Sequence, residues 1–310
     1  MKTLLPFLFF VSICMNTLAQ SEKHQQVFIM GTMHEVPKIV KNAYRPLLKM
    51  AIKYQPDAIY TEHNRSEDSL SLANDEYKFF LPYADSIASI FSENEKRTVE
   101  LMKKQVTEMT VVDFEYLKHV FAIRKDKANW SYFSYLHKYG PKGSDKPLRH
   151  ENWDLTAKLA IAMNMNYIFS MDYQQEAPLY NKLWKDCIRA SKKDGQAKLL
   201  TKHNKRDYRK HILPAIFGNL GRYSNKISTI KRYEVSNRFT FRETPCDACD
   251  EAGNIWDRRN AGMAKNIGTQ ILAKQHQKAI VIVGAGHVLG IKSELEKQFP
   301  ELLVTIVDEL

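Results

Sequence analysis

The chain has little cysteine and few long apolar runs. A transmembrane helix needs about 20 consecutive apolar residues, and no window after the N-terminal segment approaches that length. Of the four cysteines, Cys246 and Cys249 form a Cys-x-x-Cys pattern, and no second such pattern accompanies it to complete a zinc ribbon. We therefore expect no membrane span and no zinc ribbon.

The first 20 residues resemble a leader that directs export. Lys2 precedes an apolar stretch from Leu4 to Cys14, and small residues follow at Thr17 and Ala19. This order is typical of a secretory signal peptide. We predict a signal peptide over residues 1–19, a single domain over 20–310, and a periplasmic or secreted protein.

Three cysteines remain after the predicted cleavage: Cys187, Cys246 and Cys249. Outside the cytosol, a Cys-x-x-Cys turn is compatible with a local disulfide, a redox pair or half a zinc site. The pattern does not place Cys246 after a strand and at the start of a long helix, as in thioredoxin-like proteins. We predict a Cys246–Cys249 disulfide and leave Cys187 as an odd, buried thiol.

Positive charge predominates, with a formal net charge of +11. Much of the excess lies between Lys182 and Arg242. In an exported protein this pattern favours a solvated helical face or attraction to an acidic envelope surface. We do not expect nucleic acid as a partner.

Apolar strand-like runs alternate with helical patterns along the chain. The runs cover residues 25–34, 56–64, 167–172, 279–287 and 302–310. Such alternation predicts an α/β fold with a largely parallel open sheet and helices on its faces. Helical insertions are expected at about 66–137 and 177–231, where they form a cap.

Two of the strand-like runs end in the same pattern, Gly-x-x-His. Gly31 and His34 end the first, and Gly284 and His287 end the fourth. We expect each glycine to allow a sharp departure from its strand. Ligands of parallel α/β sheets gather at the carboxyl ends of strands, so both imidazoles are predicted to lie at one edge.

Two other runs end in acidic residues. Glu62 closes the second and Asp172 the third. Two imidazoles and one carboxylate are ligands for Zn, Mn, Fe or Co, so His34, Glu62 and His287 are a candidate metal site. They also suit a metal-free hydrolase in which one histidine is a general base and Glu62 orients it. Glu35 and His63 flank the candidates and are expected to point away.

A helix pattern precedes the second Gly-x-x-His. We expect Asp257 to cap it and Arg258, Arg259 and Asn260 to lie in its first turn, where anions are favoured. Arg259, Asn260 and Asp172 are the predicted substrate-binding residues. In the alternative, one arginine is on the surface and the other pairs with an acid of the site.

These segments resemble the TraB/PrgY/GumN/Tiki superfamily. The resemblance rests on "GTMH", "YTEHN", "DRRNAGMA" and "IVIVGAGHVLGI", in that order. It implies an α/β fold related to erythromycin-esterase-like and haem-binding ChaN-like proteins. It also implies a site at His34, Glu62 and His287, with the Arg-Asn pair at Arg259 and Asn260. The Tiki branch implies a metal-dependent peptidase favouring Mn or Co, and the TraB and PrgY branches imply lowering the activity of a peptide pheromone.

The leading hypothesis is an exported metal-dependent hydrolase acting on a peptide or small molecule, with Mn, Co or Zn and a metal-bound water as nucleophile. One alternative is a metal-free, esterase-like hydrolase that uses a histidine as general base. The other is a non-enzymatic protein that binds haem or an acidic partner.

Overall fold

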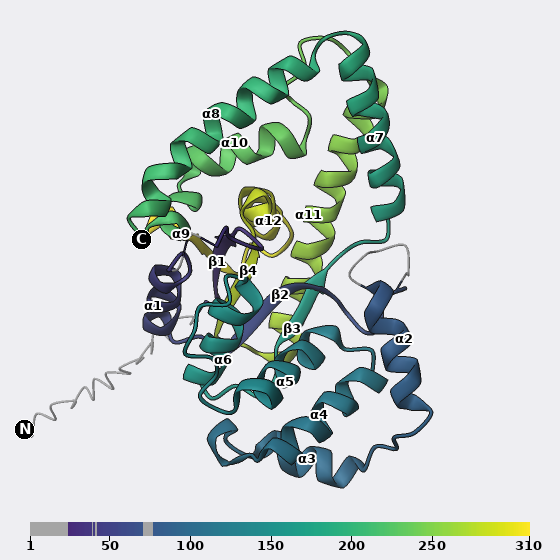
Figure 1. Ribbon diagram of the computed structural model, residues 1–310, viewed down its shortest axis with the longest axis vertical. Coiled ribbons are helices and arrows are strands. Elements are labelled where there is room, and N and C mark those ends of the chain that lie inside the picture. Colours follow the sequence, from purple (N-terminus) through teal and green to yellow (C-terminus); the bar gives the residue numbers. More distant parts are fainter. Residues whose placement is uncertain (1–23, 39, 41, 71–76) are drawn as a thin grey trace, which may run out of the picture.

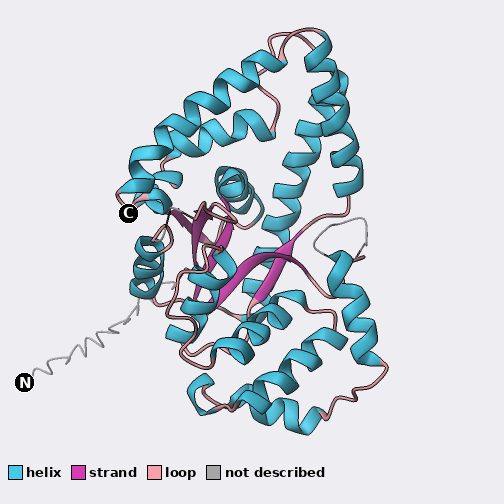
Figure 2. Ribbon diagram, in the orientation of Figure 1, coloured by secondary structure: helices cyan, strands magenta, loops and turns pink. Residues whose placement is uncertain are grey.

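A five-stranded sheet lies at the centre of the structure, a computed structural model that describes residues 24–38, 40, 42–70 and 77–310 (Figure 2). The strands are β1 (Gln26–Thr32), β2 (Ala58–Asn64), β3 (Phe169–Asp172), β4 (Lys278–Gly284) and β5 (Leu303–Ile306). All pairings are parallel, in the order β3-β2-β4-β1-β5. The α/β fold with a parallel open sheet is therefore confirmed.

Both faces of the sheet are buried, which explains why its strands are nearly continuous apolar runs. Along β1, Phe28 and Met30 join one core cluster, while Val27 and Ile29 join another on the opposite face. This division follows from the alternation of side chains along a strand.

Helices cover the sheet and extend beyond it. Below the sheet in Figure 1 lie α2 (Tyr77–Ala88), α3 (Glu95–Lys103), α4 (Val111–Ile123), α5 (Lys127–Tyr139) and α6 (Lys158–Ala162). Above it, an arch is formed by α7 (Ala177–Lys193), α8 (Ala197–Ile216), α10 (Ile227–Asn237) and α11 (Asp247–Lys274). The remaining helices are α1 (Arg45–Tyr54), α9 (Leu220–Ser224) and α12 (Val288–Gln298).

The helix α11 starts earlier than its sequence pattern suggested. It begins at Asp247 with Cys246 as its N-cap and runs for 28 residues. Asp257 is therefore not a cap, and Arg259 and Asn260 lie near the middle of the helix rather than in its first turn. Cys246 does open a long helix, contrary to expectation, although a loop rather than a strand precedes it.

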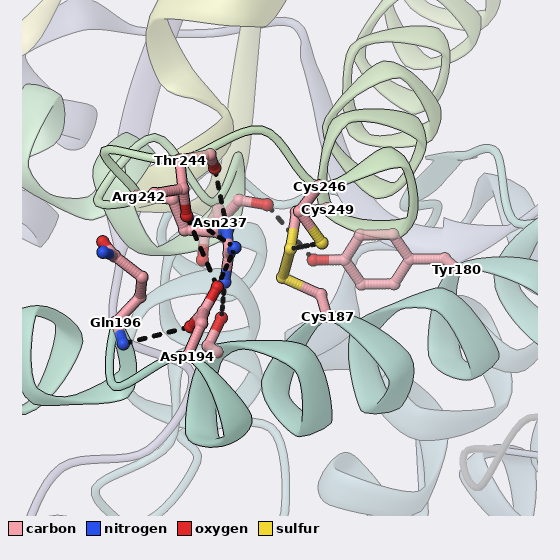
Figure 3. The surroundings of a disulfide bond; sticks show 10 residues. Tyr180, Cys187, Asp194, Gln196, Asn237, Arg242, Thr244, Cys246 and Cys249 are labelled. Carbon is pink, nitrogen blue, oxygen red and sulfur yellow. Dashed lines mark hydrogen bonds and ion pairs between the residues drawn. A yellow bond between two sulfur atoms is a disulfide. The ribbon is translucent and has the colours of Figure 1, made fainter.

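The disulfide differs from the predicted Cys246–Cys249 pair. Cys187 on α7 is bonded to Cys249 on α11, and Cys246 is a free thiol (Figure 3). The packing of α7 against α11 brings Cys187 and Cys249 together in a small buried cluster, and sequence spacing could not reveal that contact. The disulfide links two adjacent helices of the arch.

The predicted signal peptide, residues 1–19, lies outside the described residues. Among the helices that the structure describes, none combines the length and the apolar character that a bilayer crossing requires.

Candidate active site

The carboxyl ends of four neighbouring strands bring the predicted residues to one edge of the sheet. Asp172 ends β3, Glu62 lies near the end of β2, His287 follows β4, and His34 follows β1. Because these strands are adjacent and parallel, residues far apart in the sequence become neighbours.

Glu62 is the carboxylate shared by both imidazoles. Nε2 of His34 lies 3.9 Å from its Oε2, and Nε2 of His287 lies 3.7 Å from its Oε1. The backbone N–H of Gly284 donates to Oε2 at 2.9 Å. Burial raises the pKa of Glu62, and the neighbouring Arg259 acts in the opposite direction.

His34 is the accessible imidazole, with 59% of its side chain exposed. Its Nδ1 donates to Glu151 Oε1 at 2.6 Å, and the hydroxyl of Thr32 donates to the other oxygen of Glu151. The hydrogen bond to Glu151 raises the pKa of His34 to about 9. Burial alone would raise the pKa of Glu151, but its bonds from His34 and Thr32 outweigh burial and lower it.

His287 is the buried imidazole, with 3% of its side chain exposed. Its Nδ1 lies 2.6 Å from Asn260 Oδ1. The indole of Trp256 stacks on its ring with centroids 3.9 Å apart and planes 13° apart. Burial, together with the cations Arg259 and His34, holds the pKa of His287 well below its usual value. His287 is therefore neutral at neutral pH.

Arg259 joins two of the acids beneath the imidazoles. Its Nη2 donates to Glu62 at 2.7 Å, and its Nε and Nη2 each donate to Asp172 at 2.9 Å. Its Nη1 lies 3.3 Å from His287 Nε2. Arg258, by contrast, bonds Glu176 and Glu251 at the surface. The predicted alternative, with one arginine on the surface and one paired in the site, describes this arrangement.

The two motif glycines act through close packing rather than through unusual dihedral angles. Neither has a positive φ. A Cβ on Gly284 would lie 3.0 Å from His34 Nε2 and 3.3 Å from Glu62 Oε2. A Cβ on Gly31 would lie 2.9 Å from Val288 Cγ2. A left-handed backbone conformation is therefore not the reason for these glycines, whereas a Cβ at either position would be hindered.

A cavity of about 530 Å³ opens above the site. His34, Glu62, Arg259 and His287 line its floor, and residues of α8 and α10 line the opposite wall. The wall residues are His203, Asn204, Asp207, Arg232, Tyr233, Ser236 and Asn237. The arch therefore covers the candidate site, as a cap would.

Several residues lie elsewhere than their sequence positions suggested. Glu35 was expected to point away but lines the cavity. His63 does point away, toward Asn152. Asp172 and Asn260, predicted to contact substrate, are buried and absent from the cavity lining; they hold Arg259 and His287 instead.

The types of donor atom, though not their spacing, are those that hold divalent metals. Each imidazole has Nδ1 anchored, by Glu151 or by Asn260, and Nε2 directed at Glu62, which is the usual arrangement around metal-binding histidines. These three residues are not a mutually close cluster, however. In the part of the chain that the structure describes, one group of three metal-ligating side chains has all its ligand atoms within 4.8 Å of one another, and it is formed by Cys187, Cys246 and Cys249.

Three contributors to the site were missed from the sequence: Thr32, Glu151 and Trp256. Trp256 precedes Asn260 by four residues on α11, and helical spacing could have placed both on one face. Thr32 lies between Gly31 and His34, inside the motif itself. Glu151 precedes a short π-helical segment, Asn152–Ala157, and carries no comparable local signal.

Comparison with protein-family models, with curated proteins and with solved structures found no match to this chain.

Proposed function

We propose that the protein is an exported hydrolase whose reaction takes place at His34, Glu62 and His287, with a divalent metal held by these three side chains. The observation that carries the proposal is the convergence of both Nε2 atoms on the two oxygens of one buried carboxylate. When bound, such a metal polarises a carbonyl group and lowers the pKa of water.

The charge balance around Glu62 supports a dication. Glu62, Asp172 and Glu151 supply three negative charges when ionised, while Arg259 and protonated His34 supply two positive charges. A dication that displaces the proton of His34 brings this group to neutrality. Because metal ligands must be deprotonated, binding should release that proton.

The chain's own residues have distinct parts in this proposal. His34, accessible and oriented by Glu151, would hold the metal through Nε2 once that nitrogen has lost its proton. Arg259, which also lines the cavity, stabilises negative charge that develops on a substrate carbonyl oxygen. Asn260 and Asp172 are positioning residues. The polar cavity accommodates a peptide or a small ester or amide, and the resemblance to the Tiki branch favours a peptide.

A metal-free hydrolase is the second candidate, and one observation favours it. Arg259 already pairs with Glu62 and lies 3.3 Å from His287 Nε2, so part of the charge that would attract a metal is neutralised. In this candidate, Glu151 orients His34 as general base, as a carboxylate orients histidine in hydrolase triads, and the base acts in the neutral form that predominates above about pH 9.

Hydrolysis of a peptide library, with and without a chelator, tests the proposal. The metal-dependent candidate predicts activity that is lost on chelation, is restored by Mn²⁺ and is abolished in His287→Ala. The metal-free candidate predicts activity that withstands chelation and is lost in His34→Ala. Activity that survives both substitutions contradicts the hydrolytic role of this site.

For the basic region we propose an acidic partner, namely an anionic lipid surface. A groove of about 730 Å³ along α8 is lined by six basic residues: Lys198, Lys202, Lys205, Arg206, Arg209 and Lys210. In the described part of the chain, none of the six forms an ion pair. Tyr208, Leu213 and Ile216 lie exposed in the second half of the same helix, and Phe217 lies exposed at its C-cap. Basic and apolar side chains together favour a lipid headgroup region.

A further inference from the structure

Three cysteine sulfurs meet where α7 packs against the start of α11. Cys187 and Cys249 form the disulfide, and the free Cys246 Sγ lies 2.7 Å from Cys249 Sγ (Figure 3). All three sulfurs lie within 4.8 Å of one another. Cys246 is partly exposed, whereas Cys187 and Cys249 are buried. A free thiol thus touches one sulfur of a native disulfide.

We propose that this cluster is a thiol–disulfide exchange site in which Cys246 attacks the disulfide at Cys249. The attacking thiolate forms a Cys246–Cys249 bond while the Cys187–Cys249 bond breaks, and Cys187 leaves as a thiolate that takes up a proton. One disulfide and one thiol are present before and after the step, so no external oxidant or reductant is needed.

Polar contacts around the cluster hold α7 close to the segment before Cys246. Arg242 donates to Ser191 and Asp194 at 2.6 Å each, which fixes the end of α7 to the segment before Cys246. The hydroxyl of Tyr180 donates to the carbonyl of Asn237. These contacts do not involve sulfur, so Cys187 remains near Cys249 after release and the exchange is reversible.

The exchange changes which parts of the arch are linked. The Cys187–Cys249 bond joins residues separated by 62 positions and ties α7 to α11. The Cys246–Cys249 bond lies within the first turn of α11 and leaves α7 without a covalent link to it. Because α11 also carries Trp256, Arg259 and Asn260, the exchange removes the covalent link between α7 and the helix that supplies these residues to the site. The inference does not depend on the proposed hydrolytic function.

Disulfide mapping of the full chain tests the exchange directly. Protein purified without reductant is incubated at pH about 8.5, near the ordinary cysteine pKa, then quenched with acid and alkylated with N-ethylmaleimide. Trypsin and Asp-N together release the peptides DCIR, ETPC and DAC, which carry Cys187, Cys246 and Cys249 respectively. Each pairing therefore has its own mass.

We expect DCIR linked to DAC at the start, and ETPC linked to DAC to accumulate during incubation. Cys246→Ser should retain only the first pairing, and Cys187→Ser only the second. Wild-type protein that keeps only DCIR linked to DAC, that forms chiefly DCIR linked to ETPC, or that has three free thiols overturns the proposal.

Discussion

His34 donates through Nδ1 to Glu151 at 2.6 Å, although the two residues come from different ends of the N-terminal half of the chain. This hydrogen bond leaves Nε2 of His34 directed at Glu62. It also keeps the His34 imidazole protonated at neutral pH, because the neighbouring carboxylate stabilises the charged form and raises its pKa. The reactivity of the accessible imidazole therefore depends on a residue outside the Gly-x-x-His motif.

Glu151→Gln should lower the pKa of His34 from about 9 toward the ordinary value of 6.5. The cause is loss of the hydrogen bond to an ionised acceptor. NMR titration of the His34 ring in chelator-treated protein measures this shift. Glu35→Gln is the matched control, since Glu35 lines the same cavity without a hydrogen bond to His34. An unchanged titration in Glu151→Gln contradicts the assignment.

The same pair predicts a pH dependence of stability. The folded-state pKa of His34 is raised, so its contribution is fully present below about 6.5 and disappears as the pH rises through about 9. The pKa of Glu151 is lowered, so its contribution is present above its usual value of 4.5. The difference in free energy of unfolding between wild type and Glu151→Gln, measured in urea, should therefore be largest between about pH 4.5 and 6.5 and should disappear as the pH rises through about 9.

Arg259→Gln should destabilise the fold by about 3–5 kcal/mol at neutral pH, because it leaves the buried Asp172 and Glu62 without their cation. The loss should shrink as the pH falls and Glu62, whose pKa is raised by burial, becomes protonated. Arg258→Gln, at the adjacent position, should cost about 0–1 kcal/mol because its ion pairs are exposed. Equal effects in urea unfolding would argue against the buried pairing.

Gly284→Ala should impair the site more than the fold. The backbone angles of Gly284, φ −52° and ψ 131°, are open to alanine, but the new Cβ would lie 3.0 Å from His34 Nε2. Gly31→Ala should instead destabilise the fold by about 1–3 kcal/mol, since its Cβ meets the packed Val288. Activity and urea unfolding of both variants measure this contrast; equal losses of stability would refute it.

Removing Lys202, Lys205 and Arg209 together, each to Gln, should weaken binding to anionic vesicles on the order of a hundredfold, at about 1 kcal/mol per charge. Cosedimentation with vesicles at low and high salt measures the effect. Lys49, Lys53 and Lys103, exposed on α1 and α3, provide the control triple substitution. If the two triple variants bind anionic vesicles equally, or if the wild type binds anionic and neutral vesicles equally, α8 is not the docking face.

The sequence predicted the sheet well because parallel strands buried on both faces leave a plain signal. All five strand-like runs correspond to strands, and the convergence of His34, Glu62 and His287 follows from the parallel order. The start of α11 was misjudged because "CDACDEAGNI" before Trp256 has polar residues that also suit a loop.

Contacts that depend on how the helices pack could not be predicted. Cys187 reaches Cys249 through the packing of α7 against α11, and Glu151 reaches His34 from a segment between two helices. Neither contact leaves a periodic or motif signal, because each depends on how helices lie over the sheet. The supporting residues of the site therefore emerged only from the structure.

Titration of the untagged, chelator-treated protein with Mn²⁺ tests the central claim most directly. Mn²⁺ is the suitable probe because thiolates favour softer metals, so the cysteine cluster should not compete. We predict one Mn²⁺ per chain in the wild type and in His203→Ala, which alters the opposite cavity wall, and its loss in His34→Ala and His287→Ala. Undiminished Mn²⁺ binding in His34→Ala and His287→Ala would contradict the claim that these residues form one metal-holding site.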